Sequence, residues 1–324
     1  MKDRIENVII VGMGALGLLF GERIADSLGT EHLCFLMDHD RKMRHANDRY
    51  TINGKQVFFR TAAPDEVTAP ADLVIMATKY SGLYEARDLI RPVVDRDTII
   101  VSLLNGISSE EILAEKYPRR QILDCVAIGM DAVREGTSLT YRNIGRLQIG
   151  SSQPGQAEYL ALLERFLTEA KIPYEVCPDI KRAMWNKFMI NVGINQTCMV
   201  YGTGYGGATV EGSEALADLE EAMHEVIRLA VAEGIPLEEA DCRKNITMLR
   251  GLNPDGYPSM QQDAMAKRPS EVELFAGTVI SLAKKHGLEV PVNERYYRKI
   301  KEMEQALETF EGDCKHDGSD CETV

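Results

Sequence analysis

The sequence has few of the features that mark disulfide-bonded or metal-binding proteins. Its 7 cysteines are odd in number, widely spread and without a Cys-x-x-Cys pair, and its 6 histidines include no His-Glu-x-x-His motif. A disulfide framework and a zinc site are therefore not expected. We predict no bound metal, and a reducing, cytoplasmic compartment.

Apolar runs long enough to cross a membrane are also missing. The run at residues 8–20 mixes apolar residues with three glycines, is too short for a bilayer, and lacks a small-residue cleavage site. We predict that it forms a buried strand followed by a glycine turn, rather than a signal peptide. No membrane partner is expected.

Positive charge is scarce. Lys and Arg number 37 against 50 Asp and Glu, which gives a formal net charge of −13. Because affinity for a nucleic-acid backbone comes from clustered cations, nucleic acid is not an expected partner. The 324 residues, with 44% hydrophobic and 27% charged side chains, have the composition and length of two globular domains.

Strand and helix patterns alternate in the first half of the chain. Apolar runs typical of strands buried on both faces occur at residues 7–11, 33–37, 73–77 and 98–104. Helical periodicity appears at residues 15–28 and 84–94, and Asn53-Gly54 marks the turn of a hairpin at residues 50–60. This order predicts an α/β fold with a doubly wound parallel sheet.

The second half is almost entirely helical. Further strands are expected within residues 125–150, then a helix at 157–169 and a last strand at 174–176. The later helix candidates are residues 180–199, 214–233, 238–249, 271–286 and 294–307. We therefore predict a first domain at residues 1–178, an all-helical domain at 179–311, and a flexible tail at 312–324.

The first predicted strand ends in a Gly-x-Gly-x-x-Gly sequence that opens a helix. In that setting Gly12 permits the tight turn, Gly14 lets a pyrophosphate approach the backbone, and Gly17 allows close packing of helix on strand. Ala15 and Leu16 begin the helix, whose free N–H groups attract phosphate. The pattern predicts that the first domain is a Rossmann-type domain that binds a dinucleotide.

An acidic residue stands where the adenosine ribose of that dinucleotide is expected. Asp38 lies 21 residues after Gly17, and a carboxylate there favours NAD(H) because it repels the 2′-phosphate of NADP(H). Arg41, Lys42 and Arg44 follow closely, either offsetting the repulsion or forming a solvated basic turn. Both interpretations stay open.

The helical domain begins with a polar face on an apolar helix. Lys187, Asn191 and Asn195 are spaced four residues apart and fall on one side, among apolar neighbours. A helix face that is simply exposed to solvent would carry more charge than one cation and two amides. They form either an internal hydrogen-bond network, or a site at which the lysine donates a proton or holds an anion and the amides orient a substrate.

Taken together, five segments resemble the ketopantoate reductase (2-dehydropantoate 2-reductase) family over nearly the whole chain. They are Gly12–Gly17, Ala77-Thr78-Lys79, Leu104-Asn105-Gly106, the W-x-K-x-x-x-N-x-x-x-N helix from Trp185, and the Ser259-Met260…Asp263…Arg268…Glu271 segment. The resemblance implies NADP(H) as cofactor, a 2-keto acid as substrate, and a monomer or homodimer. The implied reaction reduces 2-dehydropantoate to (R)-pantoate in pantothenate synthesis.

The resemblance also implies roles in the helical domain. Lys187 matches the family's catalytic lysine, which protonates the ketone oxygen, and Glu271 matches the carboxylate that engages this lysine and the substrate hydroxyl. Asn191 and Asn195 match substrate-binding amides, and Ser259 matches the serine that holds the substrate carboxylate. In the first domain, Asn105 matches an asparagine near the nicotinamide and Lys79 a lysine beside the cofactor.

Two departures from the family pattern leave alternatives open. Leu36-Met37-Asp38 stands where the family commonly has an arginine for the 2′-phosphate, and residues 201–207 form a glycine-rich loop where it often has another asparagine. One alternative is an NAD-dependent D-2-hydroxyacid dehydrogenase acting on other branched 2-keto acids. Another, from a different class, is a binding protein that senses the dinucleotide without turning it over.

Overall fold

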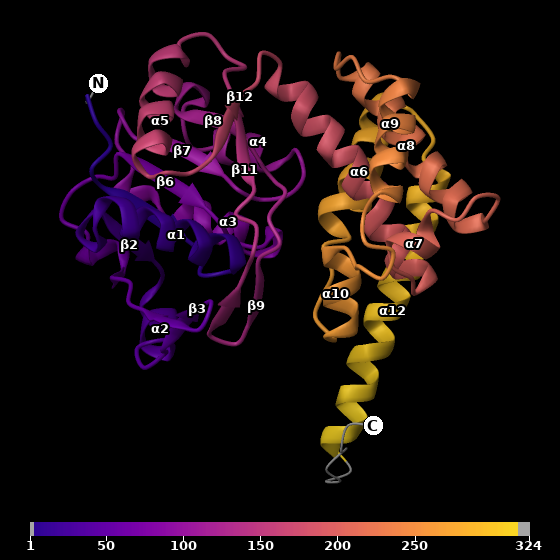
Figure 1. Ribbon diagram of the computed structural model, residues 1–324, viewed down its shortest axis with the longest axis horizontal. Coiled ribbons are helices and arrows are strands. Elements are labelled where there is room, and N and C mark those ends of the chain that lie inside the picture. The colour runs from indigo at the N-terminus through magenta and orange to yellow at the C-terminus, as the bar shows by residue number, and fades with distance from the viewer. Residues whose placement is uncertain (1–2, 317–324) are drawn as a thin grey trace. The chain divides into compact units, whose positions relative to one another are not determined.

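The computed structural model describes residues 3–316, which belong to two compact units, Met1–Met184 and Trp185–Val324. Figure 1 shows strands and helices in the first unit and helices in the second. The predicted fold class, a doubly wound α/β domain followed by a helical one, is confirmed. No helix in the described part of the chain is both long and apolar enough for a membrane span.

The first unit is built on an eight-stranded sheet in the order β12-β11-β8-β7-β6-β1-β2-β5. Its strands are β1 (Val8–Val11), β2 (Leu33–Leu36), β5 (Thr61–Ala62), β6 (Leu73–Met76), β7 (Ile99–Ser102), β8 (Ile122–Ile128), β11 (Arg146–Gly150) and β12 (Tyr174–Val176). All neighbours pair in parallel except β11 with β8. The chain passes from β1 to β2 on one side and later to β6 on the other, so β1 is the point where the strand order reverses.

Helices cover both faces of this sheet. They are α1 (Ala15–Leu28), α3 (Leu83–Leu89), α4 (Ser109–Ala114) and α5 (Ala157–Glu169), whereas α2 (His39–Arg44), which follows β2, buries none of its side chains. In β1, Val8 and Ile10 pack in one core cluster with residues of α1 and α5, whereas Ile9 and Val11 pack in another with residues of α3 and α4. This alternation of buried side chains explains why the strand is apolar throughout.

A smaller sheet packs beside α1, in the order β4-β3-β10-β9. Its strands are β3 (Tyr50–Ile52), β4 (Lys55–Val57), β9 (Val133–Glu135) and β10 (Ser138–Thr140). The predicted hairpin turn is present, with Asn53 and Gly54 at φ of 48° and 79°. The strands expected within residues 125–150 thus divide between two sheets: β8 and β11 extend the large one, while β9 and β10 join the hairpin.

The units divide six residues later than the predicted boundary at Pro178. The reason is packing: Ile180 and Met184, in the first turns of α6 (Ile180–Tyr201), are buried with Val126 and Cys177 of the first unit. The start of the helix therefore belongs to the α/β unit, and the polar face predicted on it lies in the helical unit.

The helical unit contains the predicted helices with small changes in their bounds. After α6 they are α8 (Glu214–Ala232), α9 (Glu239–Arg250), α11 (Thr278–His286) and α12 (Pro291–His316). Two short helices, α7 (Tyr205–Ala208) and α10 (Ser259–Met265), were not predicted. The segment predicted as one helix at residues 271–286 instead begins with a π-helical turn, Glu273–Gly277, before α11. Helix α12 includes residues 312–316 of the expected flexible tail, and residues 317–324 lie outside the described part.

Candidate active site

The glycine turn after β1 is fixed by two close backbone approaches. Gly12 has φ of +106°, and a Cβ there would lie 2.5 Å from the carbonyl oxygen of Ala77. A Cβ on Gly17 would lie 2.0 Å from the carbonyl oxygen of Gly12. Only glycine therefore fits at these two positions, for reasons of packing inside the protein.

Gly14 differs from its two neighbours. A Cβ there would meet only the Ala77 carbonyl oxygen, at an ordinary 3.7 Å. The protein itself thus does not require glycine at this position, which fits close approach of an external group. Gly14 is also the N-cap of α1 and has no side chain to accept a hydrogen bond, so the first N–H groups of the helix, from Ala15 and Leu16, are suited to a phosphate.

Asp38 is placed two residues after β2 and caps α2. Its Oδ1 accepts a hydrogen bond from the Arg41 backbone N–H at 2.7 Å, and its Oδ2 lies 3.4 Å from Arg41 Nε. The hydrogen bond from the Arg41 backbone holds the pKa of Asp38 below its ordinary value. The carboxylate is therefore ionised and already paired, and its side chain is 44% exposed.

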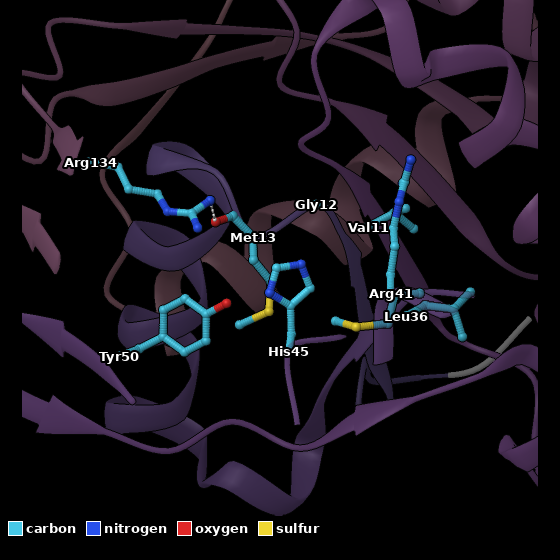
Figure 2. Close-up of a pocket in the computed structure, with 9 residues that line it drawn as sticks. Val11, Gly12, Met13, Leu36, Arg41, His45, Tyr50 and Arg134 are labelled. Carbon is cyan, nitrogen blue, oxygen red and sulfur yellow. Dashed lines mark hydrogen bonds between the residues drawn. The ribbon is translucent and has the colours of Figure 1, made fainter. Parts of the chain in front are cut away.

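A pocket opens between the glycine turn and the end of β2. Gly12 and Met37 line it together with three residues that sequence reasoning missed, His45, Tyr50 and Arg134 (Figure 2). These three come from the end of α2, from β3 and from β9, and Arg134 is joined to the strand of Tyr50 through the pairing of β9 with β10 and of β10 with β3. No local sequence motif predicts this pocket.

Lys79 and Asn105 follow the next two strands along the sheet. Lys79 is exposed just after β6, and Asn105 is half-buried after β7, next to Gly106 with φ of +92°. Since β2, β1, β6 and β7 are parallel neighbours, the glycine turn, Asp38, Lys79 and Asn105 all lie at the carboxyl edge of one sheet. That edge, at the reversal of strand order, is where doubly wound sheets bind ligands.

The polar face of α6 is present in the helical unit. Its apolar neighbours Phe188, Met189 and Val192 are fully buried, whereas Lys187 and Asn191 are partly exposed. Asn195 is buried, and its Nδ2 lies 3.5 Å from Asn191 Oδ1. A helix whose other side chains are mostly buried thus presents one cation and two amides along a single stripe.

Ser259 meets this stripe from α10. Its Oγ donates to Asn195 Oδ1 at 3.0 Å, and the backbone N–H of Met260 donates to the same oxygen at 3.1 Å. Asn195 therefore fixes the start of α10 against α6. Ser259 and Asn195, which the family resemblance predicts for one site although they are distant in the sequence, are thus in contact.

Glu271 stands just before the π-helical turn. The ring of Phe275 in that turn lies 6.5 Å from the ring of Phe188, centroid to centroid, so the turn packs on α6 at the residue that follows Lys187 in the sequence. π-Helical turns occur often at functional sites. Nearby in sequence, Arg268 Nε donates to Asp263 Oδ1 at 2.7 Å and closes the loop that joins α10 to Glu271.

Within residues 3–316 no group of three or more His, Cys, Asp or Glu side chains is arranged to hold a metal ion. Five cysteines, Cys34, Cys125, Cys177, Cys198 and Cys242, are buried free thiols.

Two family models match most of the chain. The one described as ketopantoate reductase PanE/ApbA matches residues 8–154, and its C-terminal counterpart matches residues 179–304. The chain belongs to the ketopantoate reductase family. It is accordingly an oxidoreductase, and the resemblance noted from its motifs is confirmed.

Individual members of this family are similar over nearly their whole length. A 2-dehydropantoate 2-reductase of Streptococcus pyogenes serotype M3 is 26% identical over 307 residues, which cover 93% of this chain and 97% of that protein. The structure of 2-dehydropantoate 2-reductase from Geobacter metallireducens matches with a TM-score of 0.79 at 25% identity, covering 91% of this chain and 99% of that one. A ternary structure of D-mandelate dehydrogenase with NADH and anilino(oxo)acetate matches with a TM-score of 0.82 at 22% identity, covering 93% and 99%, and shares the fold.

Proposed function

We propose that this reductase converts 2-dehydropantoate to (R)-pantoate with a nicotinamide dinucleotide as the hydride source. The observation that carries the proposal is the hydrogen bond between Ser259 and Asn195, which adds a hydroxyl to the stripe of Lys187, Asn191 and Asn195. A 2-keto acid has a carboxylate to anchor, a carbonyl to polarise and an alkoxide to protonate. One cation, two amides and a hydroxyl supply these contacts.

The glycine turn and the start of α1 hold the pyrophosphate in this proposal. Support comes from the free space at Gly14 and from the N–H groups of Ala15 and Leu16. When bound, the dinucleotide supplies the hydride. Lys79 and Asn105, at the ends of β6 and β7, contact the cofactor near its nicotinamide half.

The residues of the helical unit act on the substrate. Lys187 polarises the ketone and donates the proton to its oxygen, and Glu271 engages that ammonium group and the new hydroxyl. Asn191 and Asn195 orient the substrate, and Ser259 turns its O–H to the substrate carboxylate. Asn195 Oδ1 then keeps its second donor, the N–H of Met260, at 3.1 Å.

A second candidate substrate class is favoured by the glycine-rich loop at residues 202–207, of which residues 205–207 begin the short helix α7. A Cβ on Gly204 would lie 2.7 Å from the Gly256 carbonyl oxygen, and Gly206 N–H donates to the Pro254 carbonyl oxygen at 2.9 Å. The loop is thus docked on the segment that leads into Ser259, where it can shape the distal end of a substrate site. The alternative is a D-2-hydroxyacid dehydrogenase for other branched 2-keto acids. The binding protein that senses the dinucleotide without turnover is set aside, because the chain belongs to a family of reductases.

Steady-state rates with 2-dehydropantoate and 2-ketoisocaproate, each with NADH and NADPH, separate these candidates. The proposal predicts the highest kcat/KM with 2-dehydropantoate. A higher value with 2-ketoisocaproate favours the D-2-hydroxyacid dehydrogenase, and no turnover of 2-dehydropantoate with either cofactor refutes the proposal. Light scattering on the same preparation distinguishes the monomer from the homodimer. We propose that the reaction takes place in the cytoplasm.

A further inference from the structure

An arginine from the small sheet lines the pocket at the glycine turn. Arg134 lies on β9, far in sequence from Gly12 and Met13, and enters the pocket opposite Arg41 of α2 (Figure 2). Nothing in the nucleotide-binding motif calls for a side chain from this sheet. The position of Arg134 is therefore a feature of this chain that the proposed reaction leaves unexplained.

Neutral groups hold the Arg134 guanidinium. Its Nη1 donates to the Met13 carbonyl oxygen at 2.6 Å and its Nε to the Gly136 carbonyl oxygen at 2.8 Å, and the group lies 5.9 Å from the centre of the Tyr50 ring. Among the described residues, no carboxylate forms an ion pair with it. A half-buried guanidinium, fixed in place and without a direct counter-charge, is suited to an anionic ligand.

The other charged groups around the pocket have partners. Arg41 lies between Asp38, at 3.4 Å, and Glu85, at 3.1 Å. His45 Nδ1 lies 2.7 Å from Asp48 Oδ2, which also accepts the Tyr50 hydroxyl at 3.1 Å. The carboxylates nearest the pocket are therefore engaged, and Arg41 offsets the charge of Asp38 that would otherwise oppose an anion here.

We propose that Arg134 binds the phosphate on the adenosine ribose of NADP(H), in a pocket that it shares with Arg41. A dinucleotide on the glycine turn places its adenosine at the end of β2, where this pocket opens. The guanidinium fork matches a phosphate monoester, and the Met13 carbonyl already holds it in place. The proposal rests on the cofactor part of the proposed function and is independent of which ketone is reduced.

Calorimetry with two nucleotides that differ in a single phosphate tests this role. We expect the full chain to bind adenosine 2′,5′-bisphosphate roughly tenfold or more tightly than 5′-AMP, because charge-assisted hydrogen bonds account for such a factor. In Arg134→Met the dissociation constants of the two nucleotides should differ by no more than about threefold, and that of 5′-AMP should be the same as in the natural chain. Equal binding of the two nucleotides by the natural chain, no binding of the bisphosphate, or an unchanged ratio in R134M overturns the proposal.

Three further variants complete the design. Arg146→Met removes a surface arginine that pairs with Glu175 outside the pocket, and should leave the ratio intact. Arg134→Lys keeps the charge without the fork and should lower the ratio severalfold, which covers the case in which R134M does not fold. Asp38→Asn keeps the helix cap, removes the charge and should raise the ratio; a fall contradicts the charge balance described above. None of these binding measurements requires turnover. A failure of the proposed reduction can therefore be distinguished from a failure of the proposed phosphate site.

Discussion

Ser259 and Asn195 lie 64 residues apart in the sequence and meet through a hydrogen bond of 3.0 Å from Ser259 Oγ to Asn195 Oδ1. The bond joins α10 to the polar face of α6. It turns a stripe on one helix into a site with contributions from two elements, within a unit of amphipathic helices that pack through their apolar faces.

Substitution of Ser259 by alanine tests its role as a ligand for the substrate carboxylate. We expect KM for 2-dehydropantoate to rise about tenfold or more, the cost of one hydrogen bond to a charged group. Cofactor affinity should not change. Ser213→Ala, which removes the cap of α8 and costs about 1 kcal/mol of stability, is the control for general destabilisation and should leave KM unchanged. An unaltered KM in S259A contradicts the role.

Loss of the Lys187 side chain tests the proton donor. In Lys187→Ala we expect kcat to fall by about 100- to 10,000-fold, the range typical of general acid catalysis, while the cofactor dissociation constant stays the same. Lys244→Ala, at an exposed position of α9, is the matched control. Near-normal kcat in K187A would show that another group delivers the proton.

Two glycines of the same turn should respond differently to alanine. In Gly17→Ala the new Cβ meets the Gly12 carbonyl oxygen at 2.0 Å, so we expect a lower melting temperature. In Gly14→Ala nothing in the protein is closer than 3.7 Å, so the melting temperature should hold while cofactor affinity falls. Thermal melting and cofactor titration of both variants check this contrast. Normal cofactor affinity in G14A would show that Gly14 does not face the pyrophosphate.

A buried acid in α4 should make stability depend on pH. Burial, together with the nearby charge of Asp124, raises the pKa of Glu110 from 4.5 to about 7. The carboxyl group of Glu110 therefore holds its proton more tightly in the folded state than in the unfolded chain. As a result, the stability of the fold falls as pH rises from about 4.5 to 7 and stays reduced above pH 7. The loss amounts to about 3 kcal/mol at most.

Glu110→Gln removes this loss. We expect the variant to gain stability over the natural chain at pH 8 and to gain much less at pH 5, measured by denaturant unfolding. Glu158→Gln, at an exposed position in the first turn of α5, should show no such difference. An equal gain at both pH values would mean that Glu110 is not protonated in the folded protein at pH 5.

Local patterns were sufficient to predict most of the elements. The α5 helix and the β12 strand have the predicted bounds, because each is an amphipathic or apolar run ended by turn residues. The glycine turn was recognisable because its chemistry is confined to six consecutive residues. The stripe on α6 was recognisable because it follows a single helical period.

Features that depend on long-range pairing were not predictable. The small sheet joins residues 50–57 to residues 133–140, and this pairing alone brings Tyr50 and Arg134 to the glycine turn. Of the two interpretations left open for the cations after Asp38, the structure favours the first for Arg41, which contacts both carboxylate oxygens of Asp38; this weakens the simple inference from an acid at this position to NAD(H). The resemblance assigned Ser259 and Asn195 to one substrate site, but the hydrogen bond between them has no local signature in the sequence.

Transfer of deuterium from the cofactor to the substrate tests the central claim most directly. The chain would be incubated with 2-dehydropantoate and NADPH or NADH deuterated at the transferred position, and the product analysed by mass spectrometry. Direct hydride transfer predicts (R)-pantoate carrying one deuterium at C2. Unlabelled pantoate, or no pantoate with either cofactor, would contradict the account.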